Sequence, residues 1–575
     1  MSKLKYNMLY KINKLLSKYA CFDLLKLFFE KKASYYLEKS EPKKHAFIQN
    51  YSDSELEKIN FFCKENSKYW TSSAYSENNG IILSEGFFAE AGPNYVIRVG
   101  TITKALEEKY HIPSVFLLKG FLEEEEFKRH IWSSFGFNNF ISVMQDIYPH
   151  LSRFRIRFYT YYYFYLLKIL VYFKKFEKIR FLSHNGVRFG DLFYDEIIKI
   201  DKDNSHSFTK VTKTEFKFLK ETFKTYEYMR VLYSKYPVRF FVTTHTQYIS
   251  YGLPARYLKS KGVPIIETTD DRLFIYMDSD DKHIFKFHDY SNRAIKSVYE
   301  TIYNNNELID EAKAMLDTRF NGKLEQIDAK LAFSDKKMYS TDRLRKSLGI
   351  TNEYPFVFIL AHVFHDAPCG LSDFQIFSDY FQWLDKTVKY CSKLSGVNWV
   401  IKEHPSVDAY NERGEVQKLV SKYKRADNTI YVCPDDFSTA SLVHIAKAII
   451  TAQGTAGIEF ASQGIPPVIT SSPFYVAFGF TVEPKTEEEY YTVLRHITEL
   501  KPLNDEQKRM ALAVYKSFMM LHNTDFSIID TQVKGLVWGA GTVQDIPEAF
   551  YLVGKRLQHI NPKESVLYKN ILERC

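Results

Sequence analysis

The stretch that decides the fold is AIITAQGTAGIEFASQGIPPVIT, Ala448 to Thr470. It predicts an apolar strand, a glycine turn at Gly454 and Thr455, a helix from Ala456, a second glycine turn and another strand. Such a unit belongs to a parallel α/β sheet, where ligands bind at the carboxyl ends of the strands. Glycines let the backbone approach a ligand closely, so the first turn is a candidate phosphate site, although an ordinary crossover uses similar glycines.

A second apolar run, WVIKEHP from Trp399 to Pro405, ends abruptly in polar residues. Pro405 restricts the backbone after His404, so the imidazole is presented at the end of a strand and can donate to a phosphate oxygen. Lys402 alternates onto the same side of that strand. A histidine bonded only to neighbouring backbone is the alternative interpretation. One turn into the helix that follows the glycine turn, the Glu459 carboxylate is placed to accept from ribose hydroxyls.

Strand-like runs alternate with helical patterns along two parts of the chain, which indicates two parallel-sheet α/β domains. The runs of the first part are Gly80–Phe88, Pro113–Gly120, Lys178–Gly186, Val238–His245 and Val263–Thr269. Those of the second part are Phe356–His362, Asn398–His404, Asn428–Cys433, Ala448–Thr451 and Pro466–Thr470. Helices are expected over Thr212–Tyr236 and Leu371–Leu394.

These elements divide the 575 residues, enough to bury more than one core, into four regions. Residues 1–75, basic and without glycine, are expected to form a helical extension. Residues 76–335 are expected to form an N-terminal Rossmann-like domain, and 336–503 a C-terminal Rossmann-like domain that binds the phosphorylated ligand. Residues 504–575 form a helical tail that packs across both domains.

Composition narrows the class of protein further. The chain has 78 basic and 69 acidic residues, a net charge of +9 that is spread along the sequence. This excess suits a phosphorylated substrate or an anionic membrane surface. No RNA-recognition, zinc-finger or helix-turn-helix pattern occurs, so nucleic acid is not an expected partner. The six cysteines lack CxxC spacing and the first residues lack a signal-peptide core, which favours a reduced, cytoplasmic protein.

The nearest approach to a membrane segment is FYTYYYFYLLKILVYF, Phe158 to Phe173, with arginine and lysine at its ends. No run reaches the roughly 18 uninterrupted apolar residues of a spanning helix. Two interpretations remain open for this segment. It forms a buried aromatic helix or strand with basic ends, or it dips into the headgroups on the cytoplasmic face of the inner membrane.

The motifs above, together with PFYVAFGFT from Pro473 to Thr481, resemble the C-terminal half of GT-B-fold bacterial glycosyltransferases of surface-polysaccharide synthesis. PFYVAFGFT is also similar to the closing motif of capsule-polysaccharide Kdo transferases. The resemblance implies two Rossmann-like domains facing a cleft, with a histidine-proline element that binds the phosphate of CMP-Kdo. The chain departs from that family at Phe478, where tryptophan is usual, and at Pro467. The expected donor site comprises Lys402, His404, Pro405, Gly454, Thr455, Ala456, Glu459 and His362.

Catalytic groups are expected from the first domain. In SHNGVRFGDLFYDE, Ser183 to Glu196, a glycine precedes Asp191, so this carboxylate can approach the sugar as general base or nucleophile, unless it caps a helix. The segment also resembles the GD-containing loop of surface-polysaccharide transferases. Glu90 follows the first strand on the acceptor side, and His245 ends a later strand. The remaining candidates are Arg188 and Arg256, for the acceptor or an anionic donor.

No metal ion or other cofactor is expected besides the nucleotide sugar itself. His362, His365 and Asp366 have a spacing that mimics a metal site. The GT-B enzymes that the chain resembles usually stabilise the leaving phosphate with side chains and helix dipoles. The two histidines therefore indicate phosphate or sugar-carboxylate binding.

The sequence thus predicts a glycosyltransferase that moves a sugar, with Kdo from CMP-Kdo as the first choice, onto a bacterial surface glycan or lipid-linked acceptor. Peripheral contact with the inner membrane is a further expectation. A UDP-sugar or CDP-polyol transferase remains an alternative within the same class. A nucleotide-sugar epimerase, which needs no acceptor, and a non-catalytic partner in capsule assembly are alternatives from other classes.

Overall fold

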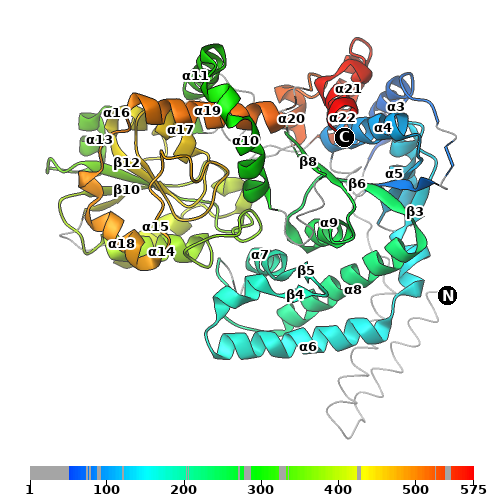
Figure 1. Ribbon diagram of the computed structural model, residues 1–575, viewed down its shortest axis with the longest axis horizontal. Helices are drawn as coiled ribbons and strands as arrows, with labels where there is room; N and C mark the ends of the chain where they lie inside the picture. Colours follow the sequence, from blue (N-terminus) through cyan, green and yellow to red (C-terminus); the bar gives the residue numbers. More distant parts are fainter. Residues whose placement is uncertain are drawn as a thin grey trace, which may run out of the picture. The chain divides into compact units, whose positions relative to one another are not determined.

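The computed structural model describes residues 51–72, 75–76, 79–86, 92–119, 122–201, 204, 206–269, 272–277, 286–322, 332–333, 336–423, 429–522, 524, 526–537 and 545–575. Two open sheets organise this part of the chain, each in its own α/β domain (Figure 1). Both sheets place their first strand in the middle and wind outward in two directions, which is the Rossmann arrangement. The expectation of two Rossmann-like domains is therefore confirmed.

The N-terminal sheet has the order β3-β2-β1-β6-β7-β8. Neighbouring strands run parallel except β7 and β8, which are antiparallel. The strands are buried along nearly their whole length, so their sequences are continuous apolar runs. Their bounds are β1 Ile81–Glu85, β2 Ser114–Leu118, β3 Phe140–Ser142, β6 Val238–Thr243, β7 Ile265–Thr269 and β8 Arg272–Tyr276.

The C-terminal sheet has five parallel strands in the order β11-β10-β9-β12-β13. The winding direction reverses between β9 and β12, because β9 continues to β10 on one side while β12 pairs with its other edge. All five predicted strands of this domain are present. Their bounds are β9 Phe356–Leu360, β10 Asn398–Lys402, β11 Ile430–Val432, β12 Ala446–Thr451 and β13 Pro467–Ile469.

Helices surround both sheets. Those that precede or belong to the first sheet's domain are α3 Asp53–Asn66, α4 Pro93–Tyr110, α5 Leu122–Ser133, α6 Arg153–Tyr172, α7 Gly190–Ile200, α8 Lys213–Lys235 and α9 Leu253–Lys259. Those that follow it are α10 Phe287–Tyr303, α11 Asn306–Phe320, α13 Thr341–Leu348, α14 Tyr380–Cys391, α15 Glu415–Tyr423, α16 Leu442–Ile445, α17 Ala456–Ser462 and α18 Glu487–Arg495. The C-terminal helices are α19 Asp505–His522, α20 Thr531–Val537, α21 Ile546–Leu557 and α22 Val566–Arg574.

The C-terminal helices contact both domains. Helix α19 packs against α17 of the second domain, and α22 packs against α4 of the first (Figure 1). The Lys563 ammonium pairs with the Glu108 carboxylate at 2.7 Å, which ties the chain before α22 to α4. The boundaries 1–75, 76–335, 336–503 and 504–575 stay predictions, and residues 1–50 lie outside the described part.

Two predicted elements are wrong. The strand expected over Lys178–Gly186 is a 3-10 helix, Phe176–Phe181, followed by a short antiparallel pair, β4 Ser183–His184 and β5 Val187–Arg188. Helix α7 starts so close to this segment that a Cβ on Gly190 would lie 2.0 Å from the Ile179 carbonyl oxygen. The helix expected over Leu371–Leu394 begins only at Tyr380, because the Asp379 carboxylate caps it by accepting from the Gln382 N–H.

The aromatic segment around Phe158 forms helix α6, which buries one face only. Ile156, Thr160, Tyr163 and Leu167 point into the domain. Among the described helices, none is long and apolar enough to cross a membrane.

Candidate functional site

Three neighbouring strands of the second sheet each deliver a candidate residue two positions after they end. His362 follows β9, His404 follows β10 and Gln453 follows β12. Because these strands are adjacent and parallel, all three residues lie at one edge of the sheet. The place between β9 and β12, where the winding reverses, is where α/β sheets of this kind bind their ligands.

His362 organises the turn after β12. Its Nε2 accepts from the backbone N–H of Gln453 at 3.3 Å and lies 3.1 Å from the Thr451 hydroxyl, while its ring stacks on Tyr380 at 4.2 Å. Loss of water around the ring, and then the nearby His404, lower the pKa of His362 to about 3. The imidazole is therefore neutral, and its Nε2 accepts a hydrogen bond from the turn. His362 thus positions the backbone of this turn and carries no charge there.

His404 lies close enough to His362 to influence its titration. The Nδ1 atom of His404 accepts from the backbone N–H of Ser406 at 3.2 Å, in the turn that begins at Pro405. A neutral ring that accepts at Nδ1 carries its proton on Nε2. In this tautomer His404 carries an N–H of the kind that a phosphate oxygen accepts.

Gly454 lies against both of these features. A Cβ built on it would be 3.0 Å from the Thr451 hydroxyl oxygen and 3.4 Å from the His362 ring. Its N–H donates to that hydroxyl at 3.2 Å. Helix α17 starts two residues later, after Thr455, and has seven residues. The His362 ring thus contacts the glycine turn and lies near His404, although the turn and His404 are about 50 residues apart in the sequence.

The PFYVAFGFT motif supports the same turn from behind. The Tyr475 hydroxyl donates to the Gly454 carbonyl at 2.5 Å. A Cβ on Gly457 would lie 2.2 Å from this hydroxyl oxygen, so only glycine leaves room for the contact. The Asn292 amide of α10 donates to the carbonyls on either side of Tyr475, at 3.0 and 2.9 Å. The motif is therefore a brace for the glycine turn.

Two other predicted donor residues are engaged by the protein itself. The Glu459 carboxylate pairs with the Arg319 guanidinium of α11 at 3.0 Å and is almost fully buried. The Lys402 ammonium lies 3.4 Å from the Phe437 carbonyl, and burial lowers its pKa. Contacts with a ribose or phosphate stay predictions for both residues.

Asp191 lies in the first turn of α7, fully buried and surrounded by cations. Arg256 binds it in a bidentate pair, at 2.5 and 2.9 Å, and the Lys286 ammonium lies 2.8 Å from Oδ2. Burial alone would raise the pKa of Asp191, but Arg256 and Lys286 outweigh it and hold the pKa well below its usual range. The carboxylate does not cap the helix. It is therefore ionised at neutral pH, which weighs against a general base, whose pKa should lie near the working pH.

Asp195, one turn further along α7, has the opposite character. Burial, with the charge of Asp191 as a further cause, raises the pKa of Asp195 to about 8. Its two oxygens accept from the backbone N–H groups of Cys369 and Gly370 in the second domain, at 3.0 and 2.7 Å. The pKa values of the two carboxyl groups on α7 thus differ widely. Asp191 is ionised near neutral pH, whereas Asp195 is protonated.

Arg188 connects this cluster to the second domain. Its Nη1 donates to the Asp373 carboxylate at 2.9 Å, and the neighbouring Ser372 hydroxyl donates to the Gln453 side chain at 2.7 Å. The Nη2 atom of Arg188 is buried and has no hydrogen-bond partner among the described residues. A buried guanidinium nitrogen left unpaired is costly, and an anion would satisfy it. Arg256 pairs with Asp191 in the structure, and its contact with an acceptor or an anionic donor stays a prediction.

His245 follows β6 at the equivalent edge of the first sheet. Its Nδ1 donates to the Thr244 carbonyl, which leaves the basic lone pair on Nε2. Glu90, the other candidate that follows a strand of the first domain, lies outside the described residues.

Two buried carboxylates of the first sheet were not predicted from the sequence. Glu85 is the last residue of β1, and Glu267 lies in the middle of β7. Burial raises the pKa of each to about 7, and a carboxylate inside an apolar strand was the signal available.

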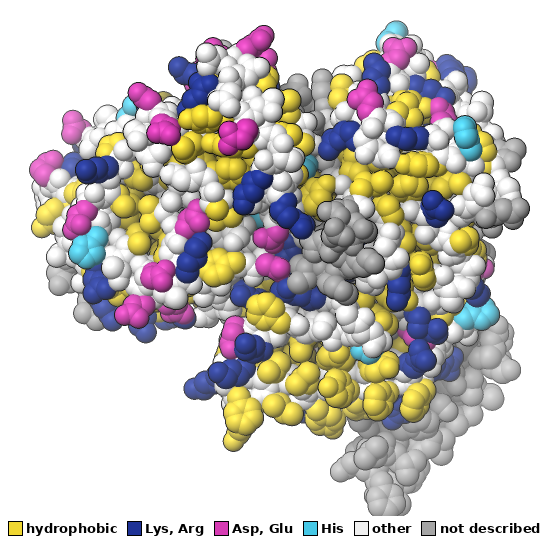
Figure 2. All heavy atoms as spheres, in the orientation of Figure 1, with side chains coloured by type: hydrophobic (Ala, Val, Ile, Leu, Met, Phe, Trp, Pro, Cys, Tyr) yellow, Lys and Arg dark blue, Asp and Glu magenta, His cyan; other side chains and the backbone are white. Residues whose placement is uncertain are grey.

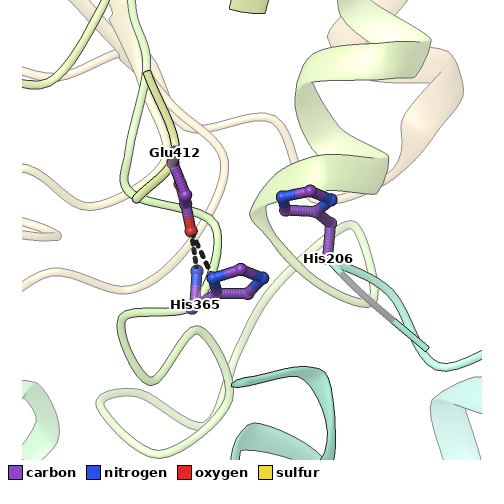
Figure 3. A group of neighbouring side chains, drawn as sticks. All are labelled: His206, His365 and Glu412. Atoms are coloured by element: carbon purple, nitrogen blue, oxygen red, sulfur yellow. Dashed lines mark hydrogen bonds and ion pairs between the residues drawn. The ribbon is translucent and has the colours of Figure 1, made fainter. Parts of the chain in front are cut away.

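His206, His365 and Glu412 form a further group at the junction of the two domains (Figure 3). One ligand atom from each lies within 4.8 Å of the others. Glu412, however, already accepts from the His365 ring at 2.7 Å and from the backbone N–H groups of Phe364 and His365. The two rings stack nearly parallel, 6° apart, so their in-plane lone pairs do not converge on one ion. This group fits a contact between domains better than a metal centre.

No protein-family model matches this sequence, and no curated protein matches it significantly. Among solved structures, the chain is similar at low level to two of KpsC from Thermosulfurimonas dismutans. Its β-Kdo 2,7 transferase is 13% identical, with a TM-score of 0.30 over 58% of this chain and 95% of that one. Its β-Kdo 2,4 transferase is 14% identical, with a TM-score of 0.30 over 48% and 79%.

A UDP-GlcNAc 2-epimerase from Neisseria meningitidis is 12% identical, with a TM-score of 0.24 over 77% of this chain and 98% of that one. These likenesses are too distant to carry an argument about substrate or reaction. The fold and the site by themselves define a protein of two Rossmann-like domains. Its buried cationic cluster and its histidine-glycine turn are linked through residues 369–373.

Proposed function

We propose that this protein is a glycosyltransferase that moves a sugar from a nucleotide donor to a growing bacterial surface glycan or glycolipid. The carrying observation is the grouping of His404, His362 and the Gly454 turn where the second sheet reverses its winding. That place suits a nucleotide phosphate, because it combines a histidine with a backbone turn that lacks a side chain at the point where parallel α/β sheets bind ligands. Kdo from CMP-Kdo is the first choice of donor, on the resemblance of the PFYVAFGFT motif.

An anionic sugar is supported by Arg188. Its Nη2 is a buried donor without a partner in the described part of the chain, and it belongs to a cluster connected to Gln453. A sugar carboxylate would complete its hydrogen bonding with a charge-assisted bond. Arg188→Met should therefore raise KM for an acidic sugar donor at least tenfold while leaving the affinity for the free nucleotide unchanged. Equal losses for both would assign Arg188 to the phosphate or to folding.

Asp191 is proposed as a nucleophile rather than a base. In this scheme its carboxylate oxygen attacks the anomeric carbon, and the bond from that carbon to the donor phosphate breaks with its electron pair leaving on the nucleotide. The acceptor hydroxyl then attacks the same carbon, gives its proton to His245 Nε2, and releases the Asp191 carboxylate. Because Asp191 is fully buried between Arg256 and Lys286, the sugar can reach it only when these contacts rearrange.

The first experiment is a thermal-shift panel with CMP, UDP, CDP and GDP. A nucleotide at 100 times its dissociation constant stabilises the folded state by about 2.7 kcal/mol, which is enough to rank the four. His404→Ala should weaken binding of the preferred nucleotide by roughly 10- to 150-fold, because a hydrogen bond to a charged group contributes about 1.5–3 kcal/mol. His444→Ala, an exposed histidine of the same domain, is the matched control and should bind normally.

The panel also separates the alternatives. A shift with UDP or CDP instead of CMP would replace CMP-Kdo by a UDP-sugar or CDP-polyol. Turnover of a nucleotide sugar without any acceptor would indicate an epimerase. Nucleotide binding without turnover by the wild-type protein would indicate a non-catalytic partner. No shift with any of the four, or equal binding by His404→Ala, would contradict the proposed donor site.

A further inference from the structure

Helix α6 presents an aromatic stripe to solvent along its whole length. Its inner face packs into the first domain, as described above. The outer face repeats large apolar side chains every three or four residues, the spacing of one helical face. At the two ends, Phe154 is 78% exposed and Tyr172 is 81% exposed. The stripe comprises Phe154, Phe158, Tyr161, Tyr162, Tyr165, Ile169, Tyr172 and Phe173, all exposed. Figure 2 shows this hydrophobic band along the lower edge of the molecule.

The charged residues of α6 itself are all basic. Between residues 153 and 176 the sequence contains no aspartate or glutamate. Its basic side chains, exposed on α6 and just after it, are Arg153, Arg155, Arg157, Lys168, Lys174 and Lys175. Exposed apolar patches of this size on soluble proteins usually mark an interaction surface. Here the partner has to accept both aromatic rings and at least six positive charges.

An anionic bilayer surface meets both requirements. Aromatic rings and long basic side chains are the residues that settle at the boundary between headgroups and acyl chains. A helix of 20 residues is about 30 Å long and can lie flat in that plane. Other occupants fit the charge poorly. A second copy of α6 would oppose like charges, and residues 1–50 contain far more lysine than acidic residues.

We infer that α6 docks this protein on a membrane surface rich in anionic lipid, lying parallel to the bilayer with its aromatic stripe among the headgroups. This inference does not depend on the proposed function, because vesicle binding and nucleotide binding are measured separately. Phosphatidylglycerol vesicles, with pure phosphatidylcholine vesicles as reference, are the probe. The full chain should float with the former, and high salt should weaken binding, since surface charges are screened.

The aromatic stripe is tested by Phe158→Ser/Tyr165→Ser/Tyr172→Ser. These side chains face solvent, so the triple variant should fold normally by circular dichroism and lose at least tenfold in vesicle affinity. The matched control exchanges three exposed apolar residues elsewhere, Met338→Ser/Tyr354→Ser/Met520→Ser. It should bind vesicles like the wild type. Equal losses in the two variants, or none in the first, would overturn the inference.

The charge is tested by Arg155→Glu/Arg157→Glu/Lys168→Glu. Each basic residue near an anionic surface contributes about fivefold to binding, so even removing three charges lowers affinity by roughly 100-fold. Lys389→Glu/Lys393→Glu/Lys501→Glu makes the same charge change on exposed positions of the second domain and should have a much smaller effect. A variant of α6 that still floats fully would assign binding to another part of the chain, such as residues 1–50, and overturn the role of α6.

A spectroscopic readout locates the contact directly. Phe158→Trp adds an indole at an exposed position of the stripe. Its additional emission should move to shorter wavelength when phosphatidylglycerol vesicles are added. Vesicle binding without such a shift would place the contact elsewhere. Sedimentation tests the alternative of self-association. If the wild type forms a dimer that the serine variant loses, and the wild type does not bind vesicles, α6 is a self-association surface and membrane docking is refuted.

Discussion

Gly457 and Tyr475 provide a sharp test of how the glycine turn is held. In Gly457→Ala the new Cβ would lie 2.2 Å from the Tyr475 hydroxyl oxygen and 2.8 Å from the ring carbon that carries it. The ring must move, and its hydrogen bond to the Gly454 carbonyl is lost. Overpacking costs about 1–3 kcal/mol and a lost hydrogen bond about 1 kcal/mol. Alanine recovers about 0.5–1 kcal/mol in a helix, which leaves a loss of about 2 kcal/mol.

Thermal denaturation followed by circular dichroism measures this loss. A destabilisation of about 2 kcal/mol lowers Tm by roughly 4–8 °C for a domain of this size. Tyr475→Phe removes the hydroxyl and, with it, the shortest contact. The double variant should therefore be more stable than the sum of the single effects by about 1 kcal/mol. Additivity within about 0.5 kcal/mol, or a neutral Gly457→Ala, would refute the proposed brace.

Three further predictions concern the two domains. Stability should fall as pH rises from about 4 to 8, because burial raises the pKa of Asp195 to about 8 and the folded state keeps a proton that the unfolded state has released. Asp195→Asn should reduce this slope by about 1.4 kcal/mol per pH unit in urea unfolding; an unchanged slope would contradict the assignment. Gly454→Ala should weaken nucleotide binding at least tenfold, whereas Gly535→Ala, where the added Cβ meets open space, should leave it unchanged; isothermal titration distinguishes them. Asp191→Asn should destabilise the protein by about 3–5 kcal/mol, measured by denaturant unfolding, because Arg256 and Lys286 lose their buried counter-charge. An unfolding curve identical to that of the wild type would show that these ion pairs do not contribute to stability.

The second sheet was predictable because each strand is a short apolar run buried on both faces. In such strands apolar and polar residues do not have to alternate, and turn residues mark where each run begins and ends. In the first sheet, β3 and β8 were missed because β3 has three residues and β8 follows β7 without a helical pattern between them. The strand expected over Lys178–Gly186 failed for a tertiary reason, since α7 packs directly on that backbone. The late start of α14 was readable, because Asp379 is a standard N-cap residue.

The candidate site was predictable in part. Residues that follow a strand, such as His362 and His404, can be placed at a sheet edge from the sequence alone. Their hydrogen-bond roles cannot, because these depend on which ring nitrogen meets which backbone group. The partners of Asp191 were also out of reach. Arg256 and Lys286 lie 65 and 95 residues further along the chain, and only the folded structure brings them to one carboxylate.

The contact between Asp195 and residues 369–370 has a consequence for mutational tolerance. Asp195 recognises main-chain N–H groups, so the partner segment is held by atoms that every residue except proline supplies. Space constrains Gly370, since a Cβ there would lie 2.9 Å from the Asp195 carboxylate, and the Cys369 side chain is buried in the core of the first domain. A library that randomises this segment should therefore return glycine at 370 and exclude proline at 369. Backbone geometry at residues 369 and 370 thus specifies part of the alignment of one lobe on the other, and the Asp373 side chain, paired with Arg188, supplies a second part that substitution can remove.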